Sequence, residues 1–444
     1  MTATELSRPP TPDTHRRRTW RAPLVLLVGA VSVYALTVVR SYFSADIWTA
    51  NFASWHLATT GNPWVEGIPF PAFDHNPLRG QWFLEANGHT VIGRAPGVIA
   101  VQLPAYWLTS PSSMTSLPGA LTAALMTGLS VLLMYLALRR VTSSTRAMLA
   151  TLVFGFTTPM WSVAANDVWP HTVTVLGIAG MAWCATHNRW WLAGVFGGVT
   201  LWGRLHAAVI VAVLGLFLAW RRRDPMIAVR MGVSSSLFLA AMSIWTHWMY
   251  GSWNPTASYD TSPFVDYAET NRISIVNQAG LWISPGRGLL VWTPVLLLLL
   301  PALVRSWRTL PDWSRALVYG GLVYTLLQGA LNRYSGGDHF YGYRLTLELL
   351  ACATPALAIA AGDLGRVGRG LLGPVLGVQL FAIAIGSVID GGFVATEDAW
   401  HTNGFLLIVD RVGPLGWLMV AVAAGLGHLA GRMLQRRTAT PSAA

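Results

Sequence analysis

Charged residues are scarce in this chain. Only 11% of its 444 residues are charged and 53% are apolar, whereas soluble domains carry about 25% charged residues. The mean hydropathy is +0.47, and long apolar runs recur along the chain. These properties exclude an ordinary soluble domain and indicate a polytopic membrane protein.

Lysine is absent, so all 30 basic residues are arginine, and the formal net charge is +11. In a soluble protein, such an excess would favour a nucleic-acid partner. Here the arginines cluster beside apolar runs, as the topology signals of membrane proteins do. We therefore expect no nucleic-acid partner.

Cysteine is nearly absent as well. The chain has two cysteines, Cys184 and Cys352, and both lie within apolar runs. A disulfide framework or a zinc site needs more cysteines at characteristic spacings. We expect both residues to serve in packing.

The apolar runs predict an all-α fold with about twelve transmembrane spans, because a spanning helix needs about 20 apolar residues. The predicted spans are residues 22–40, 119–138, 147–164, 169–186, 190–203, 205–220, 228–250, 289–307, 315–331, 345–362, 371–389 and 414–431. The arginine clusters then fall on one side, which the positive-inside rule makes cytoplasmic, together with both termini.

This topology divides the chain into three parts. We expect residues 1–21 to be a disordered basic N-terminus, residues 22–434 the transmembrane domain and residues 435–444 a cytoplasmic tail, with no soluble C-terminal domain. No small-residue cleavage site follows the first apolar run, so we expect that helix to be retained.

The predicted extracytoplasmic loops hold most of the acids, histidines and tryptophans. These loops are residues 41–118, 251–288, 332–344 and 390–413, with a short connection at 165–168. The first loop, residues 41–118, is long and varied in composition, which favours a folded, functional segment over a linker. Within it, residues 95–110 predict an interfacial helix. A tilted span is the alternative, but it would place the later arginine clusters outside, against the charge rule.

Asp46 is a lone carboxylate shortly after the first predicted span, in "SYFSADIWTANFASWHL". A carboxylate just outside the membrane edge suits a general base, because apolar surroundings can raise its pKa without preventing ionisation. The alternative is an N-cap for the helix that follows, a role that Asp commonly takes. The two roles are compatible.

Four segments, in order, resemble membrane glycosyltransferases of the GT-C fold. They are Asp46 with "NGHTVIGRAPGVIAVQLPAYWL" at 87–108, "FTTPMWSVAANDVWPHTVTV" at 156–175, "GLWISPGRGLLVWTPVLLLLLP" at 280–301 and "GGDHFYGYRLTLELLACATP" at 336–355. The resemblance covers roughly residues 22–362. This class includes protein O-mannosyltransferases, bacterial aminoarabinose transferases and actinobacterial arabinofuranosyl- and mannosyltransferases.

The resemblance implies a GT-C-like transmembrane domain in the bacterial plasma membrane, with a large first periplasmic loop and an extracytoplasmic active site. The implied activity is inverting transfer of a sugar from a polyprenyl-phosphate donor to a glycan, lipid or protein acceptor. Arabinofuranose or mannose is the preferred sugar. In the family, the acid at the position of Asp46 is the catalytic base.

Three arginines are predicted to contact the donor phosphate. The resemblance implies this role for Arg94, and snorkelling to lipid headgroups is the alternative. Arg287 and Arg344 lie at predicted outer ends of spans, where arginine is disfavoured and needs a partner. A carrier phosphate suits a guanidinium fork. The alternative is a salt bridge to Asp338 or Glu348.

Four further residues are candidates for metal or sugar binding. Asp167 and His171 could join Asp46 in binding a divalent cation such as Mg or Mn. Alternatively, Asp167 caps the next helix and His171 is hydrogen-bonded locally. Asp338 and His339 lie on a glycine-rich loop that could close over the sugar.

Two other function classes remain open on the sequence alone. A lipid-linked sugar flippase would place charged residues within broken helices at mid-membrane, where Arg204 and His206 are the candidates. A non-catalytic scaffold would have no use for clustered outer Asp and Arg residues. Trp253, Tyr259 and Tyr267 could stack on a sugar, although an interfacial aromatic belt has the same composition.

Overall fold

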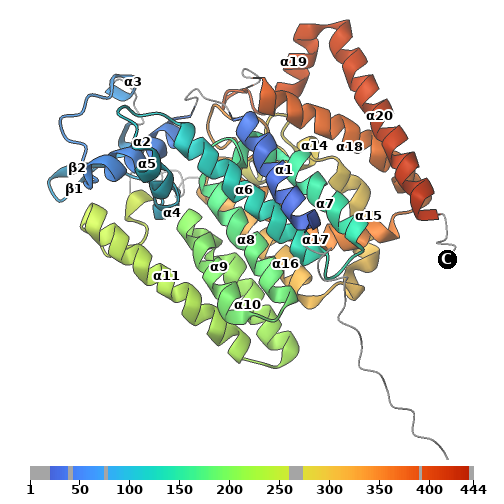
Figure 1. The fold of residues 1–444 in the computed structure, drawn as a ribbon, viewed down its shortest axis with the longest axis horizontal. Helices are drawn as coiled ribbons and strands as arrows, with labels where there is room; N and C mark the ends of the chain where they lie inside the picture. The colour runs from blue at the N-terminus through green and yellow to red at the C-terminus, as the bar shows by residue number, and fades with distance from the viewer. Residues whose placement is uncertain (1–20, 39–43, 75–78, 260–273, 390–392, 440–444) are drawn as a thin grey trace, which may run out of the picture.

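The computed structural model describes residues 21–38, 44–74, 79–259, 274–389 and 393–439. Nearly all of the predicted N-terminal segment 1–21, and residues 440–444 of the predicted tail, lie outside these ranges. Figure 1 shows a mostly helical molecule in which a central bundle carries two smaller groups of elements on different sides.

The first part of the bundle is formed by α1 (Arg21–Leu36), α6 (Leu117–Leu138), α7 (Ser144–Phe156), α8 (Pro170–Thr186), α9 (Trp190–Gly203), α10 (Ala208–Arg222) and α11 (Met226–Tyr250). Helix α8 is central because it packs against α6, α9 and α17. Its glycines permit this close approach. A Cβ at Gly180 would lie 2.1 Å from the Phe196 ring of α9.

The second part comprises α13 (Ile275–Ile283), α14 (Leu289–Trp292), α15 (Val295–Ser306), α16 (Asp312–Leu331), α17 (Leu347–Ala360), α18 (Arg366–Val388), α19 (Gly404–Val412) and α20 (Pro414–Ala439). Helices α16 and α17 pack against α10 and α8 and complete the bundle. Helices α18 and α20 pair at its edge (Figure 1).

Short helical turns join several of these elements. They are η2 (Arg79–Gln81), η3 (Met160–Ala164), η4 (Leu205–Ala207), η5 (Ala257–Tyr259), η6 (Trp307–Thr309) and η7 (Ala361–Asp363). The turn η4 separates α9 from α10, so the break predicted at "GRLHA" is present.

The region between α1 and α6 folds as a compact group of elements. It contains α2 (Ala45–Thr60), α3 (Pro71–Asp74), β1 (Phe83–Ala86), β2 (His89–Ile92), α4 (Pro96–Ala100) and α5 (Leu103–Thr109). Aromatic rings from α2, α3 and β1 form its core, with Phe70 and Phe83 4.7 Å apart and Trp48 and Phe73 5.3 Å apart. This packing fixes the first turn of α2, which carries Asp46.

The all-α prediction is wrong in this region, because β1 and β2 form a two-stranded antiparallel hairpin. Its turn is Asn87-Gly88, with φ angles of 55° and 78°. Asn-Gly is the preferred pair for a two-residue hairpin turn with positive φ at both positions. The sequence therefore contained a signal for the hairpin.

The predicted interfacial helix 95–110 is two short helices. Helix α4 is buried against α9, where a Cβ at Gly97 would meet the carbonyl of Trp202 at 2.5 Å. Only α5 exposes apolar side chains, including Trp107 and Leu108. The predicted interfacial position therefore suits α5 alone.

The described residues include five helices that are long and apolar enough to cross a membrane, so the chain is a multi-pass membrane protein. They are Leu117–Leu138, Leu205–Arg222, Met226–Tyr250, Arg366–Val388 and Pro414–Leu434. The predicted number of about twelve spans is not confirmed. Predicted spans 147–164 and 289–307 are interrupted at Pro159 and Pro294, because proline disfavours continuation of a helix through the residues before it.

Candidate active site

Asp46 lies in the first turn of α2, beside the hairpin. Ser44 occupies the N-cap position and Asp46 is the second helical residue, so the alternative N-cap role of Asp46 is wrong. A carboxylate in a first turn still interacts favourably with the helix dipole. Its side chain is 31% exposed, which leaves it accessible to a substrate.

Three side chains from distant parts of the chain donate to the Asp46 carboxylate. Arg94 Nη2 and Trp82 Nε1 bind Oδ1 at 2.9 and 3.0 Å, and Arg344 Nη1 binds Oδ2 at 3.0 Å. The structure thus brings together Asp46, Arg94 and Arg344, three of the predicted site residues. Sequence reasoning missed Trp82.

The pKa of Asp46 differs from the sequence prediction. Burial raises the pKa of this carboxyl, but the guanidinium groups of Arg94 and Arg344 and the Trp82 hydrogen bond outweigh burial and hold it well below its ordinary value. The predicted increase was wrong because it considered the apolar surroundings without the two cations. Asp46 is therefore ionised at neutral pH.

Arg94 and Arg344 are each held by further contacts. Arg94 Nε donates to Thr49 Oγ1 at 2.9 Å, and Nη1 donates to the Gly93 carbonyl at 3.2 Å. Arg344 Nη2 donates to the Gly336 carbonyl. The Arg344 guanidinium carbon also lies 4.5 Å from the centre of the Trp169 ring, a cation–π distance.

Arg287 has a different environment. It is buried, and its guanidinium donates at 2.6–3.2 Å to the carbonyl oxygens of Ser335, Phe340, Gly342 and Val394. These bonds fix the loop that leads to Arg344. The geometry argues against the predicted phosphate contact of Arg287 and favours a positioning role.

Asp167 lies in the connection before α8. Its Oδ2 accepts from Asn51 Nδ2 at 2.9 Å, and its Oδ1 accepts from the Val168 backbone N–H at 2.6 Å. Burial raises the pKa of Asp167 to about 7, although both hydrogen bonds lower it. The helix after it begins at Pro170 with Trp169 at the N-cap, so the alternative cap role of Asp167 is wrong.

His171 lies in the first turn of α8 and bridges two charged groups. Its Nδ1 is 2.8 Å from Glu348 Oε1, and its Nε2 is 3.0 Å from Arg204 Nη2. Arginine can only donate, so Nε2 accepts and Nδ1 carries the hydrogen that is donated to Glu348. The alternative for His171 assumed a local hydrogen bond. Glu348 is instead 177 positions away along the chain.

Arg204 continues this chain from the break between α9 and α10. Its Nη1 donates to Gln328 Oε1 at 3.1 Å, and His206 Nε2 donates to the same oxygen at 2.6 Å. Sequence reasoning missed Gln328 and the link from Arg204 to Glu348. Arg204 itself was named from the sequence, as a charged residue at the break between two apolar runs.

The predicted metal ligands do not fit a cation as they are arranged. Asp46 is bound to two arginines, Asp167 to Asn51 and His171 to Glu348. Within the described ranges, no group of three or more His, Cys, Asp or Glu side chains could hold a metal ion. We derive no catalytic step through a metal.

Asp338 and His339 contact Thr396 and Phe393 rather than Asp46, Asp167 or His171. Asp338 Oδ1 accepts from the backbone N–H and the hydroxyl of Thr396 at 2.7 and 2.8 Å. His339 has a φ of 59° and packs edge-on to Phe393. Their described contacts hold the loop against residues 393–396.

The three aromatic candidates separate in the structure. Trp253 stacks on His247, with ring centres 4.0 Å apart. Tyr259 is half-buried within electrostatic range of Arg204, Arg94 and Asp46, and burial raises its pKa. Tyr267 lies outside the described residues. Tyr259 is therefore the aromatic candidate placed beside the charged groups.

No protein-family model and no curated protein matches this chain. Solved structures similar to it include the archaeal oligosaccharyltransferase AglB from Archaeoglobus fulgidus, in complex with an inhibitory peptide and a dolichol-phosphate. It has 13% identity and a TM-score of 0.49, and the match covers 93% of this chain and 56% of that one. The chain thus spans little more than half the length of that protein.

ArnT from Cupriavidus metallidurans in the apo state is also similar, with 16% identity and a TM-score of 0.49. That match covers 94% of this chain and 76% of ArnT. The Archaeoglobus oligosaccharyltransferase in complex with Zn and sulfate has 14% identity and a TM-score of 0.46, with 91% and 53% coverage. At these identities and TM-scores, the likenesses do not assign the chain to a family.

Proposed function

We propose that this chain is an inverting membrane glycosyltransferase that uses a polyprenyl-phosphate sugar donor, with Asp46 as the catalytic base. One observation carries the proposal. A partly exposed carboxylate, at the edge of an apolar bundle, is held by two guanidinium groups from distant parts of the chain. Glycosyl transfer from a lipid phosphate needs a base and cations together at such a membrane edge.

The proposed reaction is a single displacement. The acceptor hydroxyl oxygen attacks the anomeric carbon of the sugar and forms the new glycosidic bond. The bond from that carbon to the phosphate oxygen breaks, and its electron pair leaves with the carrier phosphate. Asp46 takes the proton of the acceptor hydroxyl. Attack opposite to the leaving group inverts the anomeric configuration.

The two arginines control how basic Asp46 is. While both guanidinium groups contact the carboxylate, its pKa lies well below the ordinary value and it is a weak base. An incoming phosphate competes for the same cations, because guanidinium binds phosphate as well as carboxylate. Binding of the donor therefore strengthens Asp46 as a base. This would couple donor binding to proton abstraction.

The remaining assignments follow from this proposal and the sequence. The active site faces the extracytoplasmic side of a bacterial plasma membrane, and both termini are cytoplasmic. Arabinofuranose or mannose is the preferred sugar, and the acceptor is a glycan, lipid or protein segment near the membrane. Tyr259 is positioned to contact the sugar, since it lies near Asp46 and both arginines.

Transfer by membranes containing Asp46→Asn tests the proposal. Wild type and variant are supplied with radiolabelled decaprenyl-phosphate arabinose or mannose and the cell's own acceptors. We expect the variant to lose about a hundredfold or more in rate, as for removal of a general base. The matched control is Asp74→Asn, which removes an exposed carboxylate from the same region.

Folding must be checked, because Asp46→Asn leaves two arginines without their charge partner. Gel filtration in detergent and the unfolding midpoint serve for this, and Asp46→Glu retains the charge. A well-folded Asp46→Asn that transfers like wild type contradicts the proposal. If wild type transfers no sugar from either donor, a flippase or a scaffold becomes the better interpretation.

A further inference from the structure

Arg204 differs from Arg94 and Arg344 in having no carboxylate partner. Arg94 and Arg344 are paired with Asp46, and Arg287 is bound to carbonyl oxygens. Arg204 donates to Gln328 and His171, which are both neutral acceptors. Among the described residues, no carboxylate oxygen lies within 4.0 Å of its guanidinium group. Glu348 and Asp46 act on its charge from a distance, without a direct ion pair to it.

Several polar atoms around Arg204 also lack partners. Arg204 Nε, Gln328 Nε2 and Arg344 Nε are buried and have no hydrogen-bond partner in the described part of the chain. All three are donors. Glu348 Oε2, a buried acceptor in the same network, lacks a partner among the described residues too. Buried donors without acceptors are costly, and the donors outnumber this acceptor, so they favour a further acceptor in the cluster. An anion with several oxygens would satisfy them.

The charges of this cluster indicate the charge of the anion. Arg94, Arg204 and Arg344 carry three positive charges, and Asp46 and Glu348 carry two negative charges. His171 is neutral because its Nε2 accepts from Arg204. The difference, three minus two, leaves one positive charge. This excess favours an anionic ligand such as a phosphate ester.

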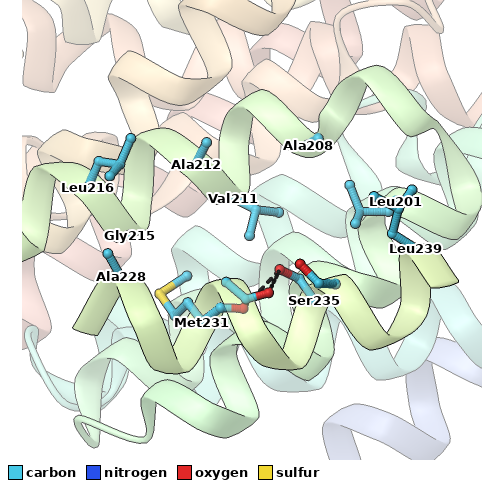
Figure 2. A pocket seen from close by; sticks show the side chains of 12 residues that line it. Leu201, Ala208, Val211, Ala212, Gly215, Leu216, Ala228, Met231, Ser235 and Leu239 are labelled. Carbon is cyan, nitrogen blue, oxygen red and sulfur yellow. Dashed lines mark hydrogen bonds between the residues drawn. The ribbon is translucent and has the colours of Figure 1, made fainter. Parts of the chain in front are cut away.

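An apolar groove begins next to Arg204. It has a volume of about 330 Å³ and runs between α10 and α11, with Leu201 of α9 at one end. Figure 2 shows Leu201, Leu239 and Ala208 toward one end and Leu216, Gly215 and Ala228 toward the other. Leu201 and Ala208 line the groove and flank the break that contains Arg204, so this end of the groove lies next to Arg204 along the chain.

The lining of the groove suits a hydrocarbon chain. The Ser235 hydroxyl donates to the Met231 carbonyl of its own helix, so it offers no free hydrogen to a ligand. Leu216 and Leu239 are 63% and 36% exposed, which shows that the groove opens on the outside of the bundle. In a bilayer that side faces lipid.

We propose that Arg204 and the α10–α11 groove form one binding site for a polyprenyl phosphate. Arg204 holds the phosphate oxygens, and the groove receives the first isoprenoid units. Gln328, His171 and Glu348 are positioning residues that orient the guanidinium. This inference rests on the proposed function, because it places the carrier phosphate of the donor beside Asp46.

Binding of radiolabelled decaprenyl monophosphate tests the inference. The full-length protein is placed in nanodiscs of neutral phosphatidylcholine, and geranyl phosphate and inorganic phosphate serve as competitors of different chain length. We expect Arg204→Gln to weaken binding about tenfold or more. Arg204→Lys should retain part of the affinity. The control Arg221→Gln, at the opposite end of α10, should bind as wild type.

The groove is tested by Gly232→Leu. Gly232 lines the groove, and a Cβ there meets nothing within 4 Å, so a side chain can start from this position and occupy the groove. It should weaken decaprenyl phosphate binding but leave competition by geranyl phosphate unchanged. Gly29→Leu is the matched control, because Gly29 is an exposed helical glycine on α1 with equal space.

The positioning role is tested at His171. His171→Phe should weaken binding about tenfold, because Arg204 loses an acceptor. His171→Gln keeps a donor for Glu348 and an acceptor for Arg204, and should restore most of the affinity. Equal losses in both variants would contradict the positioning role.

Three results would overturn the inference. The first is wild-type affinity for decaprenyl phosphate in Arg204→Gln, and the second is the same result in Gly232→Leu. The third is displacement of the probe by phosphatidylglycerol in the nanodisc as readily as by geranyl phosphate, which would indicate a general anionic-lipid site. The last result also separates carrier phosphate from ordinary lipid headgroups. Failure of the proposed function gives a different result. In that case Asp46→Asn transfers sugar at the wild-type rate, regardless of how strongly Arg204→Gln binds decaprenyl phosphate.

Discussion

Asp46 and Asp167 are two carboxylates whose surroundings shift their pKa values in opposite directions. Asp46 is partly exposed and contacts two guanidinium groups, and its pKa is held well below the ordinary value. Asp167 is buried and contacts a neutral amide and a backbone N–H, and burial raises its pKa to about 7. The charge of the partners, more than exposure, decides which acid stays ionised.

The largest expected effect separates the two acids by activity. Asp46→Asn should lose about a hundredfold or more in transfer rate, because it removes the base. Asp167→Asn should stay within about tenfold of wild type, because an amide resembles the neutral acid and the Asn51 amide can turn to accept from it. Transfer assays at saturating donor measure both. An equal loss in Asp167→Asn would show that Asp167 acts as a charged group.

The second effect concerns the pH dependence of Asp46. The base must be ionised, so activity falls as the pH drops through its pKa. Arg94→Gln removes one cation and should raise that pKa, which moves the acidic limb of kcat/KM upward by about one unit or more. Rates are measured from pH 8 down to the lowest pH at which the protein stays folded. Arg79→Gln, an exposed arginine paired with Asp74, is the control and should leave the acidic limb unmoved.

The smallest effect is on stability and concerns Asp167. Its folded pKa of about 7 lies above the ordinary value of 3.8. The folded state therefore holds the proton more tightly, and this contribution to stability is complete at low pH and is lost as the pH rises toward 7. The slope is at most about 1.4 kcal/mol per pH unit.

Unfolding midpoints in detergent between pH 4.5 and 8 measure this slope. Asp167→Asn cannot titrate, so its stability should vary less with pH than that of wild type. If wild type and variant change in parallel, Asp167 does not have a raised pKa in the protein.

Helix positions were largely predictable, because apolar run length alone sets them. The predicted span 190–203 coincides with α9, and the break after it is η4. The interruptions at Pro159 and Pro294 were not predicted, although proline is a known breaker, because hydropathy averages over it. The hairpin at 83–92 was missed because the Asn-Gly signal stood in a region assigned to helices.

Three residues of the candidate site were predictable from the sequence, but the contacts between them were not. Asp46 and Arg344 were candidates because they lie near predicted outer ends of spans, and Arg94 was a candidate because of the family resemblance. Their mutual contact depends on how α2 and the 335–344 loop pack, which no local pattern encodes. The same packing surrounds Arg287 with carbonyl oxygens, whereas its sequence environment resembles that of Arg344.

The contact between Asp46 and Arg344 joins residues 298 positions apart. During synthesis at about 5–20 residues per second, roughly 15–60 seconds separate the emergence of these two residues from the ribosome. Until then Asp46 has only its nearer partners, Trp82 and Arg94. The nascent chain therefore completes the electrostatic arrangement of its candidate base late in translation, after most of its membrane helices have been made.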